Sequence, residues 1–283
     1  MTYVLFNPLA NNKTGEKAAH DQLDKLFAEN EAEFKDITKI DDMGAFLDGL
    51  NADDRIIIAG GDGTINRFVN TIGDREINID IDYAPTGSGN DFANDVGVKP
   101  GELIRLNDYM KNLPHVTVNG KTCKFINGIG YGIDGYCCEE GDKFRVKSDK
   151  PVNYTGIAVK GVLFKFKPRN ATVIVDGEEK HFKKVWLAPT MKGRYYGGGM
   201  NVAPEQDRLA EDKKLSVVVW HGSGRLPTLM RFPKIFKGEH VKYTKMIEIK
   251  KGSNVTVKFD KPTALQIDGE TVIGVTEYSV TID

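Results

Sequence analysis

The stretch Ala59-Gly60-Gly61-Asp62-Gly63-Thr64-Ile65-Asn66, AGGDGTIN in one-letter code, decides how the first part of this chain folds. It follows the β-branched run RIIIA (55–59) and precedes apolar residues at helical spacing between 65 and 72. Glycines leave backbone N–H groups uncovered, and the first turn of a helix attracts anions. The stretch therefore predicts a phosphate-binding turn formed by Gly60, Gly61, Asp62, Gly63, Thr64, Ile65 and Asn66.

Asp62 is unusual in such a turn, because a carboxylate repels a phosphate unless a cation lies between them. A bound Mg²⁺ would satisfy both groups. The alternative interpretation is a tight connection from strand to helix in which Asp62 serves as a cap. The stretch matches neither G-x-x-x-x-G-K-[ST] nor G-x-G-x-x-G.

The first ~115 residues alternate short apolar runs with amphipathic segments. Strands are predicted at 3–7, 33–38, 55–59 and 79–85, and helices near 16–30, 43–50, 65–72 and 103–113. The run at 55–59 is apolar without alternation, as in a strand covered on both faces. This order predicts a mainly parallel sheet with helices on both sides, a three-layer α/β/α domain.

Beyond His115 the apolar residues recur every second position, and turn signals such as Asp176-Gly177 and Asp268-Gly269 separate the segments. This profile predicts an all-β part, an antiparallel β-sandwich. We expect domains at 1–117 and 118–283. The second domain is expected to complete the active-site cleft, and its last residues are candidates to pack back on the first.

The bulk composition is that of an ordinary soluble protein of 283 residues with a formal net charge of -1. No global field favours nucleic acid, so we expect none as a partner. Three cysteines without C-x-x-C spacing indicate reduced thiols, and five scattered histidines show no metal-ligand spacing. The N-terminal residues show neither a basic leader nor a long apolar run, so we expect a cytoplasmic location.

Two further polar turns follow predicted strands, PTGSGNDFA (85–93) and NPLANNKTG (7–15). Since the carboxyl ends of parallel strands share one edge of a sheet, we expect all three turns to line one crevice. Lys13 could meet a phosphate as a point charge. Taken alone, Asp91 could be a helix cap, and the first turn a polar loop with a cap at Thr14.

Together the segments NPLANNKTG, GGDGTIN and PTGSGNDFA resemble the diacylglycerol kinase catalytic family, in particular soluble bacterial lipid kinases. G-G-D-G-T alone is shared with NAD kinases and, in a variant form, with phosphofructokinases. The phrase GNDFA (89–93) favours lipid kinases. The phrases EDKKL (211–215) and LQIDGE (265–270) extend the resemblance into the second domain.

The resemblance implies ATP and Mg²⁺ and transfer of the γ-phosphoryl group to a lipid hydroxyl. Phosphoryl transfer needs alignment, charge neutralisation and a carboxylate that takes the acceptor proton. The implied nucleotide site comprises Asn7, Lys13, Thr14, Thr38, residues 60–66 and Ser88.

The implied general base is Asp268, with Glu270 nearby; the alternative for Asp268-Gly269 is a plain hairpin turn. A structural Mg²⁺ is implied at Asp212, with backbone carbonyls near Leu209 and Lys214; the alternative is a solvated acidic loop. The chain departs from the family pattern at three positions. Arg67 replaces a frequent glutamate, Ser88 a threonine, and Lys213 a glycine beside the metal aspartate.

A kinase with a lipid substrate must touch a bilayer, so we expect transient peripheral contact with the inner face of the membrane. Two apolar and basic stretches suit an anionic interface, Val159 to Arg169 and Arg225 to Lys237. In the alternative, their apolar residues pack inside and their basic residues extend to water.

Two other functions stay open, a kinase of a soluble acceptor such as NAD and a nucleotide-binding module without catalysis. Diacylglycerol, monoacylglycerol, sphingoid bases and phosphatidylglycerol all remain candidate acceptors. The oligomeric state is open as well, with a dimer through exposed strands compatible with the sequence.

Overall fold

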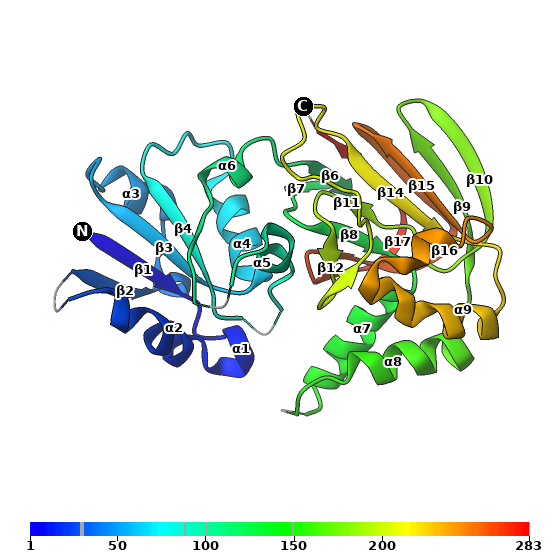
Figure 1. Ribbon diagram of the computed structural model, residues 1–283, viewed down its shortest axis with the longest axis horizontal. Helices are drawn as coiled ribbons and strands as arrows, with labels where there is room; N and C mark the ends of the chain where they lie inside the picture. The colour runs from blue at the N-terminus through cyan, green and yellow to red at the C-terminus, as the bar shows by residue number, and fades with distance from the viewer. Residues whose placement is uncertain (29–30, 88, 100, 149, 283) are drawn as a thin grey trace. The chain divides into compact units, whose positions relative to one another are not determined.

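The computed structural model describes residues 1–28, 31–87, 89–99, 101–148 and 150–282. The chain forms two compact units, Met1–Lys111 and Asn112–Asp283 (Figure 1). The boundary that we expected between residues 117 and 118 falls inside strand β6 (His115–Val118). This strand pairs with β17 (Glu270–Thr281) and β7 (Lys121–Lys124), both in the second unit. The C-terminal strand therefore pairs within its own unit.

The first unit is built on a five-stranded sheet in the order β2-β1-β3-β4-β5. Strands β1 to β4 are parallel, and β5 is antiparallel to β4. The strands are β1 (Thr2–Phe6), β2 (Ala32–Asp36), β3 (Arg55–Gly60), β4 (Asp80–Pro85) and β5 (Ile104–Arg105). The helices are α1 (Ala10–Lys13), α2 (Gly15–Leu23), η1 (Asp24–Leu26), η2 (Ile37–Lys39), α3 (Met43–Asp48), α4 (Asp62–Ile72), α5 (Asp91–Val96) and α6 (Asn107–Met110).

Helices cover both faces of this sheet, because successive side chains of a strand point to opposite sides. On one face Val4 and Ile57 pack with Leu23 of α2. On the other, Tyr3 contacts Phe46 of α3, and Tyr83 contacts Phe92 of α5, each ring pair edge to face. The first unit is thus the expected three-layer α/β/α domain.

The segment 103–113 differs from the single helix that its apolar spacing predicts. It forms β5 and the short helix α6. Asn107 explains the break, because its side chain accepts a hydrogen bond from the N–H of Ile81 and donates one to the carbonyl of Ile79. Hydrogen bonds to the edge of β4 thus outweigh the helical pattern.

The second unit is built on a ten-stranded sheet with the main order β15-β14-β11-β8-β16-β17-β6-β7, and β9 joins β16 to β10. Its recorded strand pairs are all antiparallel, as expected of a β-sandwich domain. The remaining strands are β8 (Gly128–Tyr131), β9 (Arg169–Val175), β10 (Glu178–Val185), β11 (Thr190–Met191), β12 (Tyr195–Tyr196), β13 (Met200–Asn201), β14 (Leu215–Trp220), β15 (Ile247–Gly252) and β16 (Asn254–Ile267).

The second unit also contains helices that the period-two pattern did not predict. They are α7 (Ile133–Arg145), α8 (Tyr154–Lys160), the π-helix η3 (Gly161–Lys165), α9 (Arg225–Arg231), η4 (Phe232–Lys237) and η5 (Glu239–Lys242). A core that includes Trp186 and Trp220 packs against them, whereas a separate core of strand residues such as Tyr131 and Tyr278 lies within the sheet. The helices form one side of this unit (Figure 1).

Candidate functional site

The carboxyl edge of the first sheet collects the predicted nucleotide residues. Since β1 to β4 are parallel and adjacent, the residues that follow them lie at one edge. Asn7 follows β1, Thr38 lies in η2 after β2, and Gly61 follows β3. The turn 85–93 follows β4; Ser88, a predicted site residue within it, lies outside the described residues.

The turns after β3 and β4 pack backbone against backbone. A Cβ on Gly87 would lie 2.4 Å from the Cα of Gly61, and a Cβ on Gly60 would lie 2.3 Å from Oγ1 of the buried Thr64. The carbonyl of Gly60 accepts hydrogen bonds from the N–H groups of Thr86 and Gly87, each at 2.9 Å. Glycine is thus required at 60 and 87 by packing alone.

Asp62 joins the two turns. It lies in the first turn of α4, where the N-cap is Gly61. Its carboxylate accepts hydrogen bonds from the N–H of Asp91 at 2.8 Å and the N–H of Phe92 at 3.0 Å. Asp62 therefore caps α5, the neighbouring helix, and this N-terminus stabilises its negative charge. The cap expected from the sequence is present, but it serves a different helix.

Tyr83 supports the same junction from beneath. Its buried hydroxyl lies 3.1 Å from the carbonyl of Gly60 and 3.2 Å from Oδ1 of Asn90. Burial raises the pKa of Tyr83 well above its ordinary value, and the charges of Asp62 and Asp91 raise it further. The phenol is therefore a neutral donor that holds the two turns together.

Two other glycines of these turns are not explained by packing. Apart from the adjoining residues and the helix's own backbone, a Cβ on Gly63 or on Gly89 would meet no described atom within 4 Å, and neither residue has a φ in the left-handed region. Neither conformation nor crowding demands glycine there. A ligand that approaches the backbone closely would explain glycine at both positions, as the phosphates of a nucleotide would.

Asn7 and its loop form a rigid turn beside this edge. The side-chain oxygen of Asn7 accepts a hydrogen bond from the N–H of Leu9. The backbone N–H of Asn7 donates to the carbonyl of Ala59 in β3. Lys13 is exposed, with a φ of 67°. Thr14 is the N-cap of α2, but its hydroxyl donates to the carbonyl of Asn11 instead of capping the helix. The charged end of this loop thus faces solvent.

Thr38 is exposed at the end of the edge strand, and its N–H and hydroxyl both donate to Oδ1 of Asp36. Burial alone would raise the pKa of Asp36, but these bonds and the charge of Lys39 lower it. Within α4, Ile65 is fully buried, and Asn66 is bonded through its carbonyl and side chain by Asn70. The buried side chain of Ile65 therefore anchors the helix in the first unit.

Asp268 lies at the tip of the hairpin between β16 and β17, where it and Gly269 have φ angles of 44° and 94°. The hairpin interpretation is therefore right for the backbone. The side chain adds more, since it is only 8 % exposed and its carboxylate accepts the N–H groups of Ile126, Asn127 and Gly128. Three backbone donors fix its orientation and stabilise its ionised form.

Arg208 extends this arrangement. The buried guanidinium donates to the carbonyl of Ile126 and to Oδ1 of Asn127, each at 3.0 Å. The segment 126–128 is thus held on two sides. Asp268 accepts hydrogen bonds from its N–H groups, and Arg208 donates to the carbonyl of Ile126 and to the side chain of Asn127. Glu270, two residues beyond Asp268, begins β17, and its exposed side chain forms no hydrogen bond or ion pair with the part of the chain that the structure describes.

Asp134 is a buried carboxyl group that the sequence analysis did not single out. It lies in the first turn of α7, and its Oδ2 accepts a hydrogen bond of 2.6 Å from the hydroxyl of Tyr196. Its Oδ1 has no partner among the described residues. Burial raises the pKa of Asp134 to about 6, although the bond from Tyr196 opposes this. The sequence signal that could have identified Asp134 is its position among four closely spaced glycines, at 128, 130, 132 and 135.

The predicted metal loop is closed by its own side chains. Gln206 donates to the carbonyls of Asp207 and Lys214 and accepts the hydroxyl of Ser216. Oδ1 of the exposed Asp212 accepts the N–H of Lys214. Lys213 has a φ of 50°, the left-handed region that favours glycine, which the resemblance expects at this position.

The charge around this loop does not favour a dication. Residues 206–214 contain three acidic and three basic side chains, and Oδ1 of Asp207 already accepts the N–H of Leu209 at 2.9 Å. Lys192 is only 6 % exposed nearby; burial and the charge of Arg208 lower its pKa to about 8. No group of three or more acidic, histidine or cysteine side chains that could hold a metal exists in the described part of the chain. The residues therefore do not fit the structural Mg²⁺.

The three cysteines are free thiols. Burial raises the pKa of Cys138 to about 12 and raises that of Cys137 further, with an added contribution from Asp134. Burial raises the pKa of Cys123 as well. These thiols are protonated at neutral pH, consistent with the reduced state expected from the sequence.

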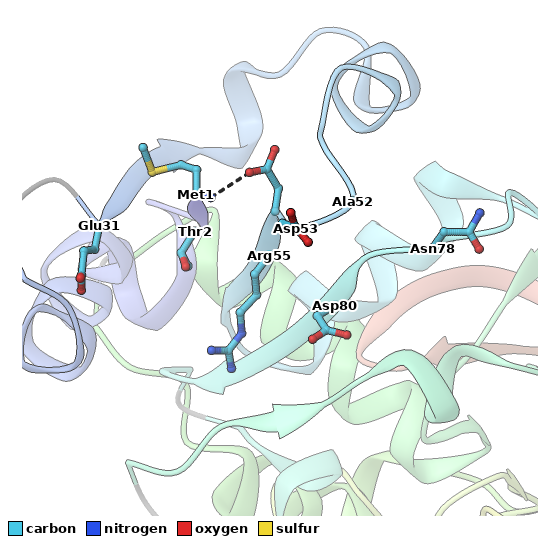
Figure 2. A pocket seen from close by; sticks show the side chains of 9 residues that line it. Met1, Thr2, Glu31, Ala52, Asp53, Arg55, Asn78 and Asp80 are labelled. Atoms are coloured by element: carbon cyan, nitrogen blue, oxygen red, sulfur yellow. Dashed lines mark hydrogen bonds and ion pairs between the residues drawn. The ribbon is translucent and has the colours of Figure 1, made fainter.

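A hollow of about 660 Å³ lies elsewhere in the first unit. Figure 2 shows side chains around it that begin β1, β3 and β4, including Met1, Arg55 and Asp80. These are the amino ends of the strands, opposite the edge that carries the glycine turns. Its carboxylates are engaged at least in part by cations; Asp54, for example, binds the N-terminal amino group at 2.8 Å. We assign it no role in the candidate site.

The comparisons with known proteins cover almost the whole chain. Residues 1–116 match the family described as the diacylglycerol kinase catalytic domain. Residues 127–282 match the YegS C-terminal NAD kinase beta sandwich-like domain. The chain belongs to the diacylglycerol kinase catalytic family. Members of this family are phosphotransferases, and this chain is a lipid kinase by family.

Curated members of the family are similar along most of their length. A diacylglycerol kinase from Mycobacterium tuberculosis is 26% identical over 255 residues, 84% of this chain and 79% of the relative. A diacylglycerol kinase from Bacillus subtilis is 25% identical over 224 residues, 77% of this chain and 71% of the relative. A solved structure of a diacylglycerol kinase from Bacillus anthracis has a TM-score of 0.60 at 18% identity and covers 99% of this chain and 93% of its own. This last likeness supports the fold.

The described helices are all too short or too polar to cross a membrane. The candidate site thus consists of two groups of residues, each defined within its own unit. One is the glycine-lined edge of the first sheet. The other is the polar cluster around residues 126–128, to which Asp268 and Arg208 belong.

Proposed function

We propose that this chain is an ATP- and Mg²⁺-dependent lipid kinase that transfers the γ-phosphoryl group of ATP to the hydroxyl of diacylglycerol or a related lipid. The observation that carries the proposal is the hydrogen bonding of Asp62 to the start of α5. It makes one rigid platform of two glycine turns, and Gly63 and Gly89 leave open backbone on it. Such a platform suits a triphosphate.

In this reaction the lipid hydroxyl oxygen forms a bond to the γ-phosphorus, and the bond from that phosphorus to the β,γ-bridging oxygen breaks. ADP leaves with the electron pair of the broken bond, and the hydroxyl proton goes to a carboxylate. We assign this base role to Asp268, because three N–H donors keep its carboxylate ionised and oriented. The exposed Glu270 is the second carboxylate of the same hairpin.

Mg²⁺ would arrive with the nucleotide and neutralise charge on its phosphates. Lys13, exposed beside the first strand, and the residues of the glycine turns would hold the phosphates. Asn7 and Thr38 lie at the same edge and would border the nucleotide. The proposed function requires no structural metal at Asp212, since Gln206 closes that loop.

Diacylglycerol is the acceptor class named for the two curated relatives described above. A water-insoluble acceptor also requires contact with a bilayer. We therefore place the protein in the cytoplasm, with transient contact at the inner face of the membrane.

The test is incubation of the purified protein with labelled ATP, Mg²⁺ and a total lipid extract, in parallel with NAD as acceptor. Label that partitions into chloroform and has the mass of a lipid phosphate supports the proposal. Label found in NADP instead would show a kinase of a soluble acceptor. ATP binding without transfer to either would show a nucleotide-binding module, and both outcomes would overturn the proposal.

A further inference from the structure

Apolar side chains protrude from the helical side of the second unit. Phe164 of η3 is 71 % exposed, and Leu226 and Met230 of α9 are 64 % and 70 % exposed. Leu226 and Met230 are four residues apart and so lie on one face of α9. The buried Thr228 lies between them in sequence and faces the interior. The protruding residues are therefore directed away from the core.

Phe164 borders an open apolar hollow of about 680 Å³. Its lining comes from a short part of the chain, the end of α7, α8 and η3, and includes Phe144, Ile157, Val159 and Leu163. The α9 segment contacts η3, and the guanidinium of Arg225 donates to the carbonyl of Val162 within it. Helix α8 runs directly into η3, so α8 and α9 are connected through η3 (Figure 1). The two segments thus belong to one helical layer.

Basic residues outnumber acidic ones along the segments that carry these apolar groups, although Arg145 pairs with Asp142 and Lys234 pairs with Glu239 just outside them. Between residues 144 and 169 the basic residues are Arg145, Lys147, Lys150, Lys160, Lys165, Lys167 and Arg169, against the single acid Asp149. Between 225 and 237 they are Arg225, Arg231, Lys234 and Lys237, with no acid. A chain of net charge -1 therefore carries an excess of positive charge in these two segments.

Three of these lysines are available to a partner. Lys160, Lys165 and Lys167 are exposed and form no ion pair with any residue that the structure describes. Exposed lysines elsewhere in the unit often do form one; Lys258, for example, pairs with Glu277 at 3.0 Å. Unpaired ammonium groups beside protruding phenylalanine and methionine complement negative headgroups above acyl chains.

We propose that the layer formed by α8, η3, α9 and η4 docks on an anionic lipid surface. Phe164, Leu226 and Met230 would enter the acyl region, and Lys160, Lys165 and Lys167 would meet the headgroups. The inference deepens the proposed function, because it names the surface through which a lipid acceptor would be reached. The positive charge of this layer favours an anionic lipid surface over a second copy of the chain, because a second copy would bring its own basic layer against this one.

The test is sedimentation of the full-length protein with vesicles of phosphatidylcholine alone or with 30 mol% phosphatidylglycerol, at low and high salt, without ATP. We expect binding only to the anionic vesicles. The triple substitution Lys160→Gln, Lys165→Gln, Lys167→Gln should weaken it roughly tenfold or more, because each base near such a surface adds to the attraction. Phe164→Asn should weaken it as well, by loss of insertion.

Matched variants control for charge and for apolar area. Lys121→Gln, Lys183→Gln and Lys261→Gln together change the charge equally at exposed lysines that form no ion pair with described residues. Ile249→Asn removes an exposed apolar residue on β15. These controls should bind vesicles as the unmodified protein does. Equal loss in the controls, or equal binding to vesicles of phosphatidylcholine alone, would overturn the proposal.

Two further measurements distinguish failure of the docking proposal from failure of the proposed kinase function. With a short-chain diacylglycerol in detergent micelles, the Lys160/165/167 and Phe164 variants should phosphorylate the acceptor at the rate of the unmodified protein. If that activity exists but vesicle binding does not, only the docking surface is wrong. If size-exclusion chromatography shows a dimer that Phe164→Asn converts to monomer, a second copy covers this layer and the lipid proposal is overturned.

Discussion

The carboxylate of Asp62 caps the helix that begins at Asp91, although the two residues are 29 positions apart. Its second bond reaches the N–H of Phe92 at 3.0 Å. The turn after β3 and the turn after β4 are therefore one structural element. A nucleotide held by one turn would also depend on the other.

Replacement of Asp62 by Asn should disturb both turns. The amide group would place an N–H₂ against one of the two backbone donors, leaving it unsatisfied at a cost of about 1–3 kcal/mol. We expect a loss of that size in the free energy of unfolding and a weaker affinity for ATP by calorimetry. Asp53→Asn, at an exposed position outside the turns, is the control. Unchanged stability and affinity in Asp62→Asn would contradict this role.

The glycines of the turns should separate into two classes. Gly87→Ala places a Cβ 2.4 Å from the Cα of Gly61, so we expect a marked loss of thermal stability. Gly63→Ala meets nothing within 4 Å, so it should keep its stability but bind ATP more weakly. Melting curves and nucleotide titrations of both variants measure the difference. Normal ATP affinity in Gly63→Ala would remove this residue from the phosphate site.

Asp268→Asn should reduce turnover by a factor on the order of 10² or more if the carboxylate is the base. The same change also sets an amide against the donors of residues 126–128, so the variant's stability must be measured beside its rate. Glu270→Gln alters only an exposed side chain and should fold normally. If Glu270→Gln abolishes turnover and a folded Asp268→Asn does not, the base is Glu270.

The raised pKa of Asp134 predicts a pH-dependent stability. Because the pKa rises from 3.8 to about 6 on folding, the folded state binds this proton more tightly than the unfolded state does. The resulting stability is complete below pH 4 and is lost as the pH rises through 6, a change of about 3 kcal/mol. Relative to the unmodified protein, Asp134→Asn should gain about that amount between pH 4 and pH 7. Denaturant unfolding across this range measures it.

Asp212→Asn is the control for this comparison, because that side chain is exposed. Its stability relative to the unmodified protein should stay nearly constant over the same pH range. A flat difference for Asp134→Asn as well would show that this carboxyl titrates normally.

Removal of Mg²⁺ should leave the nucleotide-free protein unchanged. Gln206 closes the loop 206–214, so we expect melting temperatures in EDTA and in millimolar Mg²⁺ to agree within about 1 °C. Gln206→Ala should instead lower the melting temperature, since it leaves the carbonyl of Lys214 without this donor. A rise of several degrees with Mg²⁺ alone, lost in Asp212→Asn, would restore the structural metal site.

Local patterns were sufficient to predict much of the first unit. The β-branched run 55–59, the glycines after it and the helical spacing from 65 to 72 predicted β3, the turn and α4. Each depends on neighbouring residues only. The hairpin at Asp268-Gly269 was predicted for the same reason, since a two-residue turn is set by its own backbone preferences.

Contacts between distant residues could not be predicted in this way. Nothing in the spacing of Asp62 and Asp91 indicates a hydrogen bond, and nothing in the sequence around Asp268 points to the N–H groups of residues 126–128. The pairing of Asp134 with Tyr196 spans 62 positions. The helices α8 and α9 were missed because their exposed apolar residues weaken the periodicity that normally reveals a helix.

The raised pKa values of the three cysteine thiols make the chain a convenient background for site-directed labelling. Since all three are held as protonated thiols, maleimide reagents should react slowly with them and rapidly with a newly introduced exposed cysteine. A fluorophore attached to F164C would then report, through its emission and its quenching by lipids, how deeply that position enters a bilayer.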